Sequence, residues 1–348
     1  MLQKRLVKTP TLSQNIISTK SESNEHVLFI HGNASSSVFW EEQMEMLSQD
    51  YHAIAVDLRG YGATEGLAMD ATQGCKQWAE DIIELLDELK IERCHLVGHS
   101  MGGSAIYNLL LLQPQRFKSA VLVASASPFG FGGTKDIYGT PCYDDFAGTG
   151  GGTVNQEFAR LMKEGDKSED NPQASPRVVM NSFYWKPPFR PVREEQLLDS
   201  LLSQRVAADA YPGDFESSAN WPFVAPGKFG PVNASSPKYV LAGAKKLMES
   251  KVSLPFLWIR GSDDQIVSDN SLFEMGTLGK LGLVPGYPGE DIYPPQPMIG
   301  QTRYFLEQLS KGGSSFREVV MENTGHTPFV EKAAEFAQLL HDHLQSTQ

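Results

Sequence analysis

The strongest constraint on the fold is a regular alternation of short apolar runs with helical patterns in the first third of the chain. Apolar runs over residues 27–30, 52–56 and 94–97 each end in turn or small polar residues, as buried strands do. Residues 77–90 repeat apolar side chains at helical spacing with acidic residues between them, and the uncharged residues 101–112 predict a deeply packed helix. This order predicts an α/β protein with a doubly wound, mostly parallel sheet.

The alternation continues with a strand-like run over residues 120–124, breaks off, and then resumes. Residues 128–252 are rich in Gly, Pro, Ser and aromatic side chains, whereas residues 254–259 and 316–321 again predict strands and residues 329–344 a closing helix. We therefore expect one core from residues 1–127 and 253–348, with residues 128–252 inserted as a cap or lid. The Gly- and Pro-rich residues 276–300 predict a long ordered loop beside the core.

Composition narrows the possible partners and the compartment. The 348 residues carry 42 acidic against 30 basic side chains, a formal charge of -12, which disfavours binding to nucleic acid or to an anionic membrane. Three cysteines without CxxC spacing are typical of buried thiols in a reducing compartment. The sequence contains neither a secretion signal nor a long apolar span, so we expect a cytoplasmic protein whose partner is a small-molecule substrate.

The run Gly98-His99-Ser100-Met101-Gly102 carries the strongest chemical signal. It lies between the predicted strand 94–97 and the predicted helix 101–112, where a sharp turn requires small neighbours and exposes the serine hydroxyl. The free amides at the start of the helix favour a developing oxyanion. Ser100 is therefore the predicted nucleophile, although a GxSxG match alone is also found in ordinary tight turns.

A second loop is expected to complete an oxyanion hole beside Ser100. Residues 31–35, HGNAS, follow the predicted strand 27–30, which a parallel sheet would place next to the strand that ends at the serine turn. We expect the backbone amides of Asn33 and Met101 to point at the same place. The alternative interpretation of this segment is a turn rich in small residues that merely follows a strand.

A serine nucleophile needs a base and an acid that orients the base. His326 is the predicted base because it follows the strand 316–321 in a loop that a parallel sheet would present to Ser100. Asp263 and Asp264 are the acid candidates, since both follow the strand 254–259. The order Ser, Asp, His is the one expected of this catalytic architecture.

Five segments together resemble the α/β-hydrolase superfamily. They are HGN at 31–33, DLRGYG at 57–62, GHSMGG at 98–103, and GSDDQIV at 261–267 followed by GHTPFVE at 325–331. The resemblance covers residues 25–127 and 253–345 and implies an α/β-hydrolase fold. In the family's GxxDxxV pattern the acid is the third residue after the glycine, which implies Asp264 rather than Asp263. The family's DxxGxG run is structural, and we interpret Asp57 and Arg59 in that way.

The loop HGNASSSVFW is also similar to the upstream loop of haloalkane dehalogenases, but those enzymes and the related epoxide hydrolases attack with an aspartate. Ser100 instead predicts acyl transfer through an acyl-enzyme, with no metal or organic cofactor. We expect hydrolysis of a small to medium, mostly apolar ester or lactone. The alternatives are cleavage of a carbon–carbon bond in a diketone-like substrate, amide hydrolysis or perhydrolysis, and a receptor-like protein with an idle triad.

The predicted cap supplies the expected substrate pocket. Four aromatic side chains in its Gly- and Pro-rich stretches are the candidates for lining an apolar pocket: Phe129, Phe131, Trp185 and Trp221.

Overall fold

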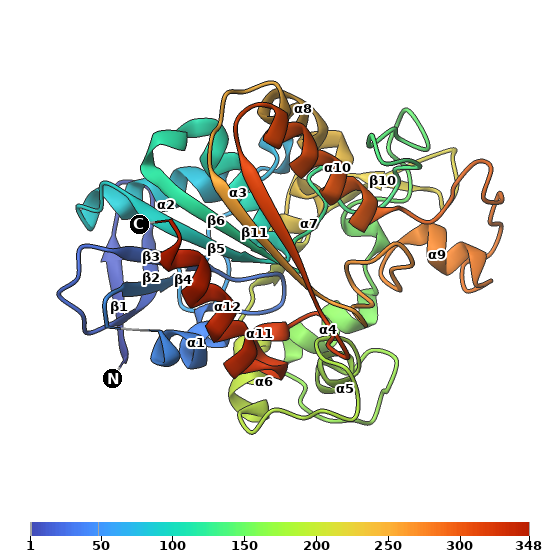
Figure 1. The fold of residues 1–348 in the computed structure, drawn as a ribbon. Helices are drawn as coiled ribbons and strands as arrows, with labels where there is room; N and C mark the ends of the chain where they lie inside the picture. The colour runs from blue at the N-terminus through green and yellow to red at the C-terminus, as the bar shows by residue number, and fades with distance from the viewer. Residues whose placement is uncertain (1, 48, 348) are drawn as a thin grey trace.

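The computed structural model describes residues 2–47 and 49–347, and an eight-stranded sheet forms the centre of this part of the chain (Figure 1). The strands follow the order β1-β2-β4-β3-β5-β6-β11-β12 across the sheet. Their bounds are β1 Leu2–Lys8, β2 Ser13–Thr19, β3 His26–Ile30, β4 His52–Val56, β5 Cys94–His99, β6 Phe117–Val123, β11 Pro255–Gly261 and β12 Ser315–Met321. From β4 to β12 neighbouring strands are parallel, while β2 is antiparallel to both β1 and β4. The predicted doubly wound, mostly parallel sheet is confirmed.

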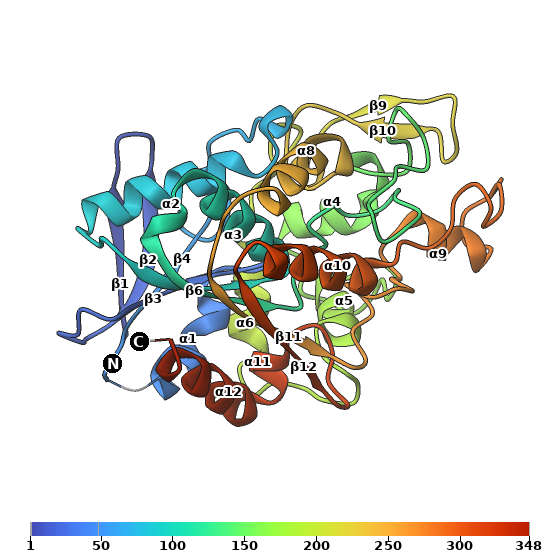
Figure 2. The same ribbon diagram turned by 45° about the horizontal axis from the view of Figure 1, so that its top comes forward.

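Helices cover both faces of the sheet (Figures 1 and 2). One face packs against α2 Lys76–Glu88, α3 Met101–Leu112, α8 Pro237–Met248 and α10 Met298–Lys311. The other face packs against α1 Glu41–Met46, α6 Glu194–Leu202, α11 Pro328–Glu331 and α12 Ala333–Gln345. Because both faces are buried, most residues of the central strands are apolar.

Alternate residues of each central strand supply the two cores. In β3, Leu28 and Ile30 join the core under α2 and α3, whereas Val27 and Phe29 join the core under α1 and α12. This is the two-residue period of a strand, and it explains why each strand is apolar on both of its faces. The bounds of the strands and helices predicted in the first third of the chain agree with the observed bounds to within three residues.

Three features of the fold differ from the sequence expectation. The single closing helix over 329–344 is divided into α11 and α12, since Lys332 leaves the helical conformation at φ −129°. The hairpin of β1 and β2 was not expected, because the outer strand β1 is largely exposed and carries Lys and Arg, as edge strands do. The third feature is the predicted loop over residues 276–300, which is not wholly irregular, because α9 Met275–Lys280 occupies its start and α10 begins at Met298 before its end.

Residues 128–252, the predicted cap, contain several short elements. They are α4 Gln156–Glu164, α5 Pro176–Phe183, α6, β7 Val206–Ala207, β8 Tyr211–Pro212, β9 Phe215–Ser217, β10 Val224–Pro226, α7 Pro231–Ala234 and α8. The last of these, α8, packs beside α3 and α10 in the core layer. Beyond β11, α9 Met275–Lys280 and the irregular residues up to α10 project from one end of the sheet (Figure 2). Among the described helices, none is long and apolar enough to cross a bilayer.

Asp57 and Arg59 have the structural positions expected of them. The Asp57 carboxylate accepts hydrogen bonds from the amides of Ser37 at 2.7 Å and Ala63 at 2.9 Å, and so anchors the loops after β3 and β4. Arg59 forms a two-point ion pair with Asp81 of α2, at 2.6 and 2.7 Å, and both side chains are buried. Burial raises the pKa of Asp81, although its hydrogen bonds to Arg59 act in the opposite direction.

We expect Arg59→Met to reduce the free energy of unfolding by about 3–5 kcal/mol, because it leaves the buried Asp81 carboxylate without its partner. Arg160→Met is the matched control, since Arg160 pairs with Glu157 and Glu164 on the exposed face of α4 and its loss should change stability little. Urea unfolding at neutral pH measures both variants. Equal losses for the two would contradict a structural role for the Arg59 pair.

Candidate active site

Ser100 occupies a strained turn between β5 and α3. Its backbone has φ 51° and ψ −117°, a conformation that costs free energy for any residue with a Cβ atom. The turn is held by hydrogen bonds from the Ser100 amide to the Val123 carbonyl at 2.9 Å and from the Ala126 amide to the Ser100 carbonyl at 3.0 Å. The ends of β5 and β6 therefore fix the position of the serine.

The loop after β3 lies directly against this turn. A Cβ atom added to Gly32 would lie 2.9 Å from the Ser100 Cβ atom, and one added to Gly102 would lie 2.6 Å from the Ile30 carbonyl oxygen. Real Cβ atoms essentially never approach other atoms this closely. Glycine is therefore required at both positions because two backbone segments meet there.

His326 and Asp264 form a buried hydrogen-bonded pair. The His326 Nδ1 atom lies 2.8 Å from the Asp264 Oδ2 atom, and both residues are less than one-tenth exposed. The other carboxylate oxygen of Asp264 accepts the amides of Ile266 at 2.8 Å and Val267 at 3.0 Å. The carboxylate is thus held by backbone on one side and orients the imidazole on the other.

Asp263, the other acid candidate, points elsewhere. Its carboxylate pairs with the Lys186 ammonium at 2.7 Å, and its side chain is one-third exposed. The hydrogen bond to Lys186 lowers the pKa of Asp263. Of the two neighbouring aspartates, the structure brings only Asp264 to His326.

His99 connects the His326 loop to the serine turn. Its Nε2 atom donates to the His326 carbonyl oxygen at 2.9 Å, and the two imidazole rings lie 4.6 Å apart between centroids. Burial and the nearby His326 ring hold the pKa of His99 well below its usual value, so His99 stays neutral. Because His99 precedes Ser100 directly, this bond holds the backbone of the His326 loop beside the serine turn.

The predicted oxyanion residues lie on the two segments that meet at Ser100. Met101 is the first residue of α3, and a helix leaves its first amides without partners in the helix. The Asn33 amide donates to no acceptor within the described residues. The Asn33 side chain is engaged instead, with its Oδ1 atom accepting from the Tyr61 hydroxyl at 2.9 Å and from Gln204 Nε2 at 3.0 Å.

The predicted pocket aromatics lie in different places. Phe129 is fully buried against Tyr304 and Phe305, and Trp221 packs with Tyr287 and Tyr293 in a small separate cluster, so packing explains the burial of both. Phe131 is half-buried and donates its amide to the Ser235 carbonyl at 3.0 Å. Trp185 is buried beside the His326 loop, where its backbone lies close to Gly325.

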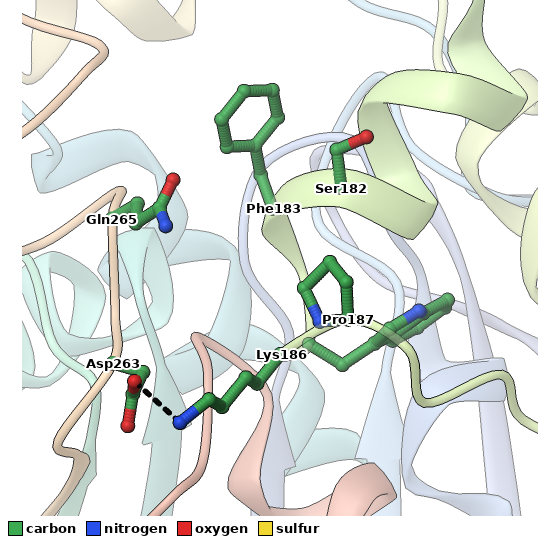
Figure 3. Close-up of a pocket in the computed structure, with 7 residues that line it drawn as sticks. Ser182, Phe183, Lys186, Pro187, Asp263 and Gln265 are labelled. Carbon is green, nitrogen blue, oxygen red and sulfur yellow. Dashed lines mark ion pairs between the residues drawn. The ribbon is translucent and has the colours of Figure 1, made fainter.

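A cavity of about 200 Å³ borders the loop that carries Asp264 (Figure 3). Phe183 and Gln265 are among its lining residues, and so are Lys186 and Asp263, which form an ion pair with each other. Of the predicted pocket aromatics, Trp185 alone is among its lining residues. The aromatic and Pro-rich stretch YWKPPFRP at 184–191 was recognisable in the sequence as part of the predicted cap. Nothing in the sequence indicated that this stretch lies beside the loop that carries Asp264.

The cysteines do not form a site. All three are free thiols, and burial raises the pKa of Cys75, Cys94 and Cys142 to about 12. Cys142 is only partly buried, contrary to the expectation for all three. Among the residues that the structure describes, no group of three or more His, Cys, Asp or Glu side chains is placed to hold a metal ion.

The fold and the sequence together establish the family. The model of the alpha/beta hydrolase fold family matches residues 25–278, which is more than half of the chain. The protein therefore belongs to the α/β-hydrolase family, as the sequence motifs implied.

Curated relatives match the chain over shorter segments. An epoxide hydrolase of Caballeronia sordidicola is 39% identical over 102 residues, covering 29% of this chain and 31% of that protein. The carboxylesterase YbfK of Bacillus subtilis (strain 168) is 31% identical over 117 residues, covering 33% of this chain and 38% of the relative. The matches thus span about a third of the length of these relatives.

Solved structures match the chain over nearly its whole length. A serine hydrolase from Cycloclasticus zankles superposes with a TM-score of 0.63 at 18% identity, covering 99% of both chains. The esterase RhEst1 from Rhodococcus sp. ECU1013 superposes with a TM-score of 0.61 at 19% identity, covering 100% of this chain and 99% of that chain. At these identities the similarity demonstrates the shared fold.

We expect the same glycine-to-alanine change to have opposite effects in two helices. Gly102→Ala in α3 should destabilise the protein by about 1–3 kcal/mol, because its Cβ atom would overlap the Ile30 and His31 carbonyl oxygens. Gly243→Ala in α8 should stabilise it by about 0.5–1 kcal/mol, since its Cβ atom meets only Leu111 at 3.4 Å and alanine favours the helix. Urea unfolding measures both, and a stable Gly102→Ala variant would contradict the close approach.

Proposed function

We propose that the protein is a serine hydrolase in which Ser100, His326 and Asp264 form the catalytic triad. The observation that carries the proposal is the His326–Asp264 hydrogen bond at 2.8 Å, tied to the strained Ser100 turn through the bond from His99 to the His326 carbonyl. The strained backbone of Ser100 also supports the proposal, because such conformations are concentrated at functional sites.

In the proposed mechanism His326 takes the proton of the Ser100 hydroxyl while the oxygen attacks the substrate carbonyl. The amides of Asn33 and Met101 stabilise the negative charge of the tetrahedral intermediate. Asp264 holds the imidazole in the tautomer that accepts this proton at Nε2 and stabilises the imidazolium. His326 then protonates the leaving group, and water, activated by the same residue, releases the acid from the acyl-enzyme.

The substrate class that we propose is a small to medium, mostly apolar carboxylic ester or lactone. A carboxylesterase among the curated relatives, and esterases among the structures that share the fold, support an ester substrate. The similarity to an epoxide hydrolase does not extend to the proposed chemistry, because the residue at the nucleophile turn is Ser100 rather than an aspartate. Phe183 and Trp185 line the cavity beside the acid loop, which neither Ser100 nor His326 lines, so we propose that they contact a part of the substrate away from the reacting carbonyl.

Two neighbouring aspartates provide a matched test of the triad. We expect Asp264→Asn to lower kcat for a short acyl ester by about 10⁴-fold, since an amide at this position favours the wrong imidazole tautomer. Asp263→Asn removes a partly exposed partner of Lys186 and should leave kcat within a few-fold of the wild-type value. Steady-state kinetics over a panel of acyl esters measures both variants.

The kinetics test both the choice of Asp264 as the acid and the proposed substrate class. A larger loss from Asp263→Asn than from Asp264→Asn would reverse the choice of acid. A wild-type protein that hydrolyses none of the esters and lactones in the panel would contradict the proposed substrate class.

A further inference from the structure

The loop that carries the proposed oxyanion amide is held in a strained conformation. Ala34 has φ 46°, a left-handed backbone that is unfavourable for a residue with a Cβ atom. Such a conformation persists only where surrounding contacts determine it. The contacts that determine it here come from both the core and the predicted cap.

The core fixes the peptide unit that contains the Asn33 amide. The Gly32 carbonyl oxygen accepts hydrogen bonds from the Ser35 hydroxyl at 2.9 Å and from His31 Nδ1 at 2.7 Å. In a trans peptide the next N–H points away from this oxygen, so the two bonds direct the Asn33 amide to the opposite side. His31 donates through Nδ1 because its Nε2 atom accepts the Leu58 amide at 3.0 Å.

Gln204, just beyond α6 in the predicted cap, fixes the following peptide unit. Its Oε1 atom accepts the Ala34 amide at 3.1 Å, and its Nε2 atom donates to the Asn33 side-chain oxygen at 3.0 Å. The residue is 4% exposed, so both bonds form away from water. One carboxamide therefore holds the loop by its backbone and by its side chain.

Tyr184, just beyond α5, links the same loop to the proposed base. Its hydroxyl donates to the Ala34 carbonyl oxygen at 2.8 Å, and its own carbonyl oxygen accepts the Thr327 amide at 2.7 Å and the Thr327 hydroxyl at 2.6 Å. Thr327 follows His326 directly. Burial raises the pKa of the Tyr184 hydroxyl well above its usual value, so it remains a donor at neutral pH.

We propose that Tyr184 and Gln204 are positioning residues for the oxyanion hole, and that the predicted cap is therefore part of the catalytic apparatus. This inference rests on the proposed function. Within the described residues, neither side chain hydrogen-bonds to the side chain of Ser100 or His326, although the Tyr184 ring meets the His326 ring edge-on at 6.5 Å between centroids. Each holds the strained Asn33–Ala34 segment, so that the Asn33 amide keeps its direction as negative charge develops on the substrate. A small displacement of such a donor is costly, because its contribution depends on preorganisation.

The test uses three variants that each remove hydrogen-bonding groups with little change in shape. Tyr184→Phe removes the donor to the Ala34 carbonyl, and Gln204→Met removes both contacts of the carboxamide. Tyr239→Phe is the matched control, because the Tyr239 hydroxyl donates to the Gly227 carbonyl at 2.7 Å within the same inserted segment. For each protein we would measure kcat and KM on an acyl ester, the inhibition constant of an ester-like trifluoromethyl ketone, the pH dependence of kcat/KM, and thermal stability.

We expect Tyr184→Phe and Gln204→Met to lower kcat by about 10- to 100-fold with little change in KM. The inhibition constant of the trifluoromethyl ketone, which forms an oxyanion on attack by serine, should rise by the same factor as kcat/KM falls. The pH profile should keep its midpoint, since the His326–Asp264 bond is untouched. Tyr239→Phe should retain the wild-type kcat even if its thermal stability falls as far as that of Tyr184→Phe.

Two results would overturn the inference in distinguishable ways. An active wild type whose Tyr184→Phe and Gln204→Met variants keep kcat and ketone affinity within twofold of the control would overturn the positioning role alone. A wild type that neither hydrolyses esters nor binds the ketone would overturn the proposed function, and the positioning role with it.

Discussion

The close approach of the loop after β3 to the turn after β5 is the constraint on which the rest of the site depends. The two strands are paired in parallel, so both loops leave the same edge of the sheet side by side. Gly32 faces the Ser100 Cβ atom, and Gly102 faces the Ile30 carbonyl, so the two segments are in direct contact with no room for a side chain between them. The loop after β12 lies at the same edge. There, His99 donates a hydrogen bond to the carbonyl oxygen of His326.

Residues from the predicted cap complete the same arrangement. Tyr184 contacts the loop after β3 through its hydroxyl and the His326 loop through its carbonyl oxygen. Glu331 of α11 adds a second connection, because its carboxylate accepts the amides of Gly325 at 2.7 Å and Lys186 at 3.1 Å. Burial raises the pKa of Glu331 despite these bonds. A segment bound to both loops is better suited to shaping the site than to swinging freely above it.

The local parts of this structure could be predicted from the sequence, because they follow from short-range patterns. The strand before Ser100, the small residues around it and the helix after it fix the turn within a few residues. The position of His326 after a strand was likewise predictable, and the choice of Asp264 over Asp263 required the spacing of a family motif. Geometry agrees with that choice, since only Asp264 bonds to His326.

The long-range contacts could not be predicted from the sequence. Gln204 and Ala34 are 170 positions apart, and no periodicity relates them. The roles of Phe129 and Trp221 could not be predicted either. An aromatic residue in a Gly- and Pro-rich stretch is equally compatible with lining a pocket and with packing in a small hydrophobic core. Only the tertiary structure distinguishes the two, and it packs both rings against other aromatic side chains.

The central claim is that Ser100 is an activated nucleophile. Mass spectrometry of the intact protein after reaction with a fluorophosphonate, followed by peptide mapping, tests it most directly, with Ser100→Ala as the control. The account predicts a single adduct at neutral pH, located on Ser100 and lost in the variant. No adduct on the folded wild-type protein, or an adduct that persists in Ser100→Ala, would contradict it.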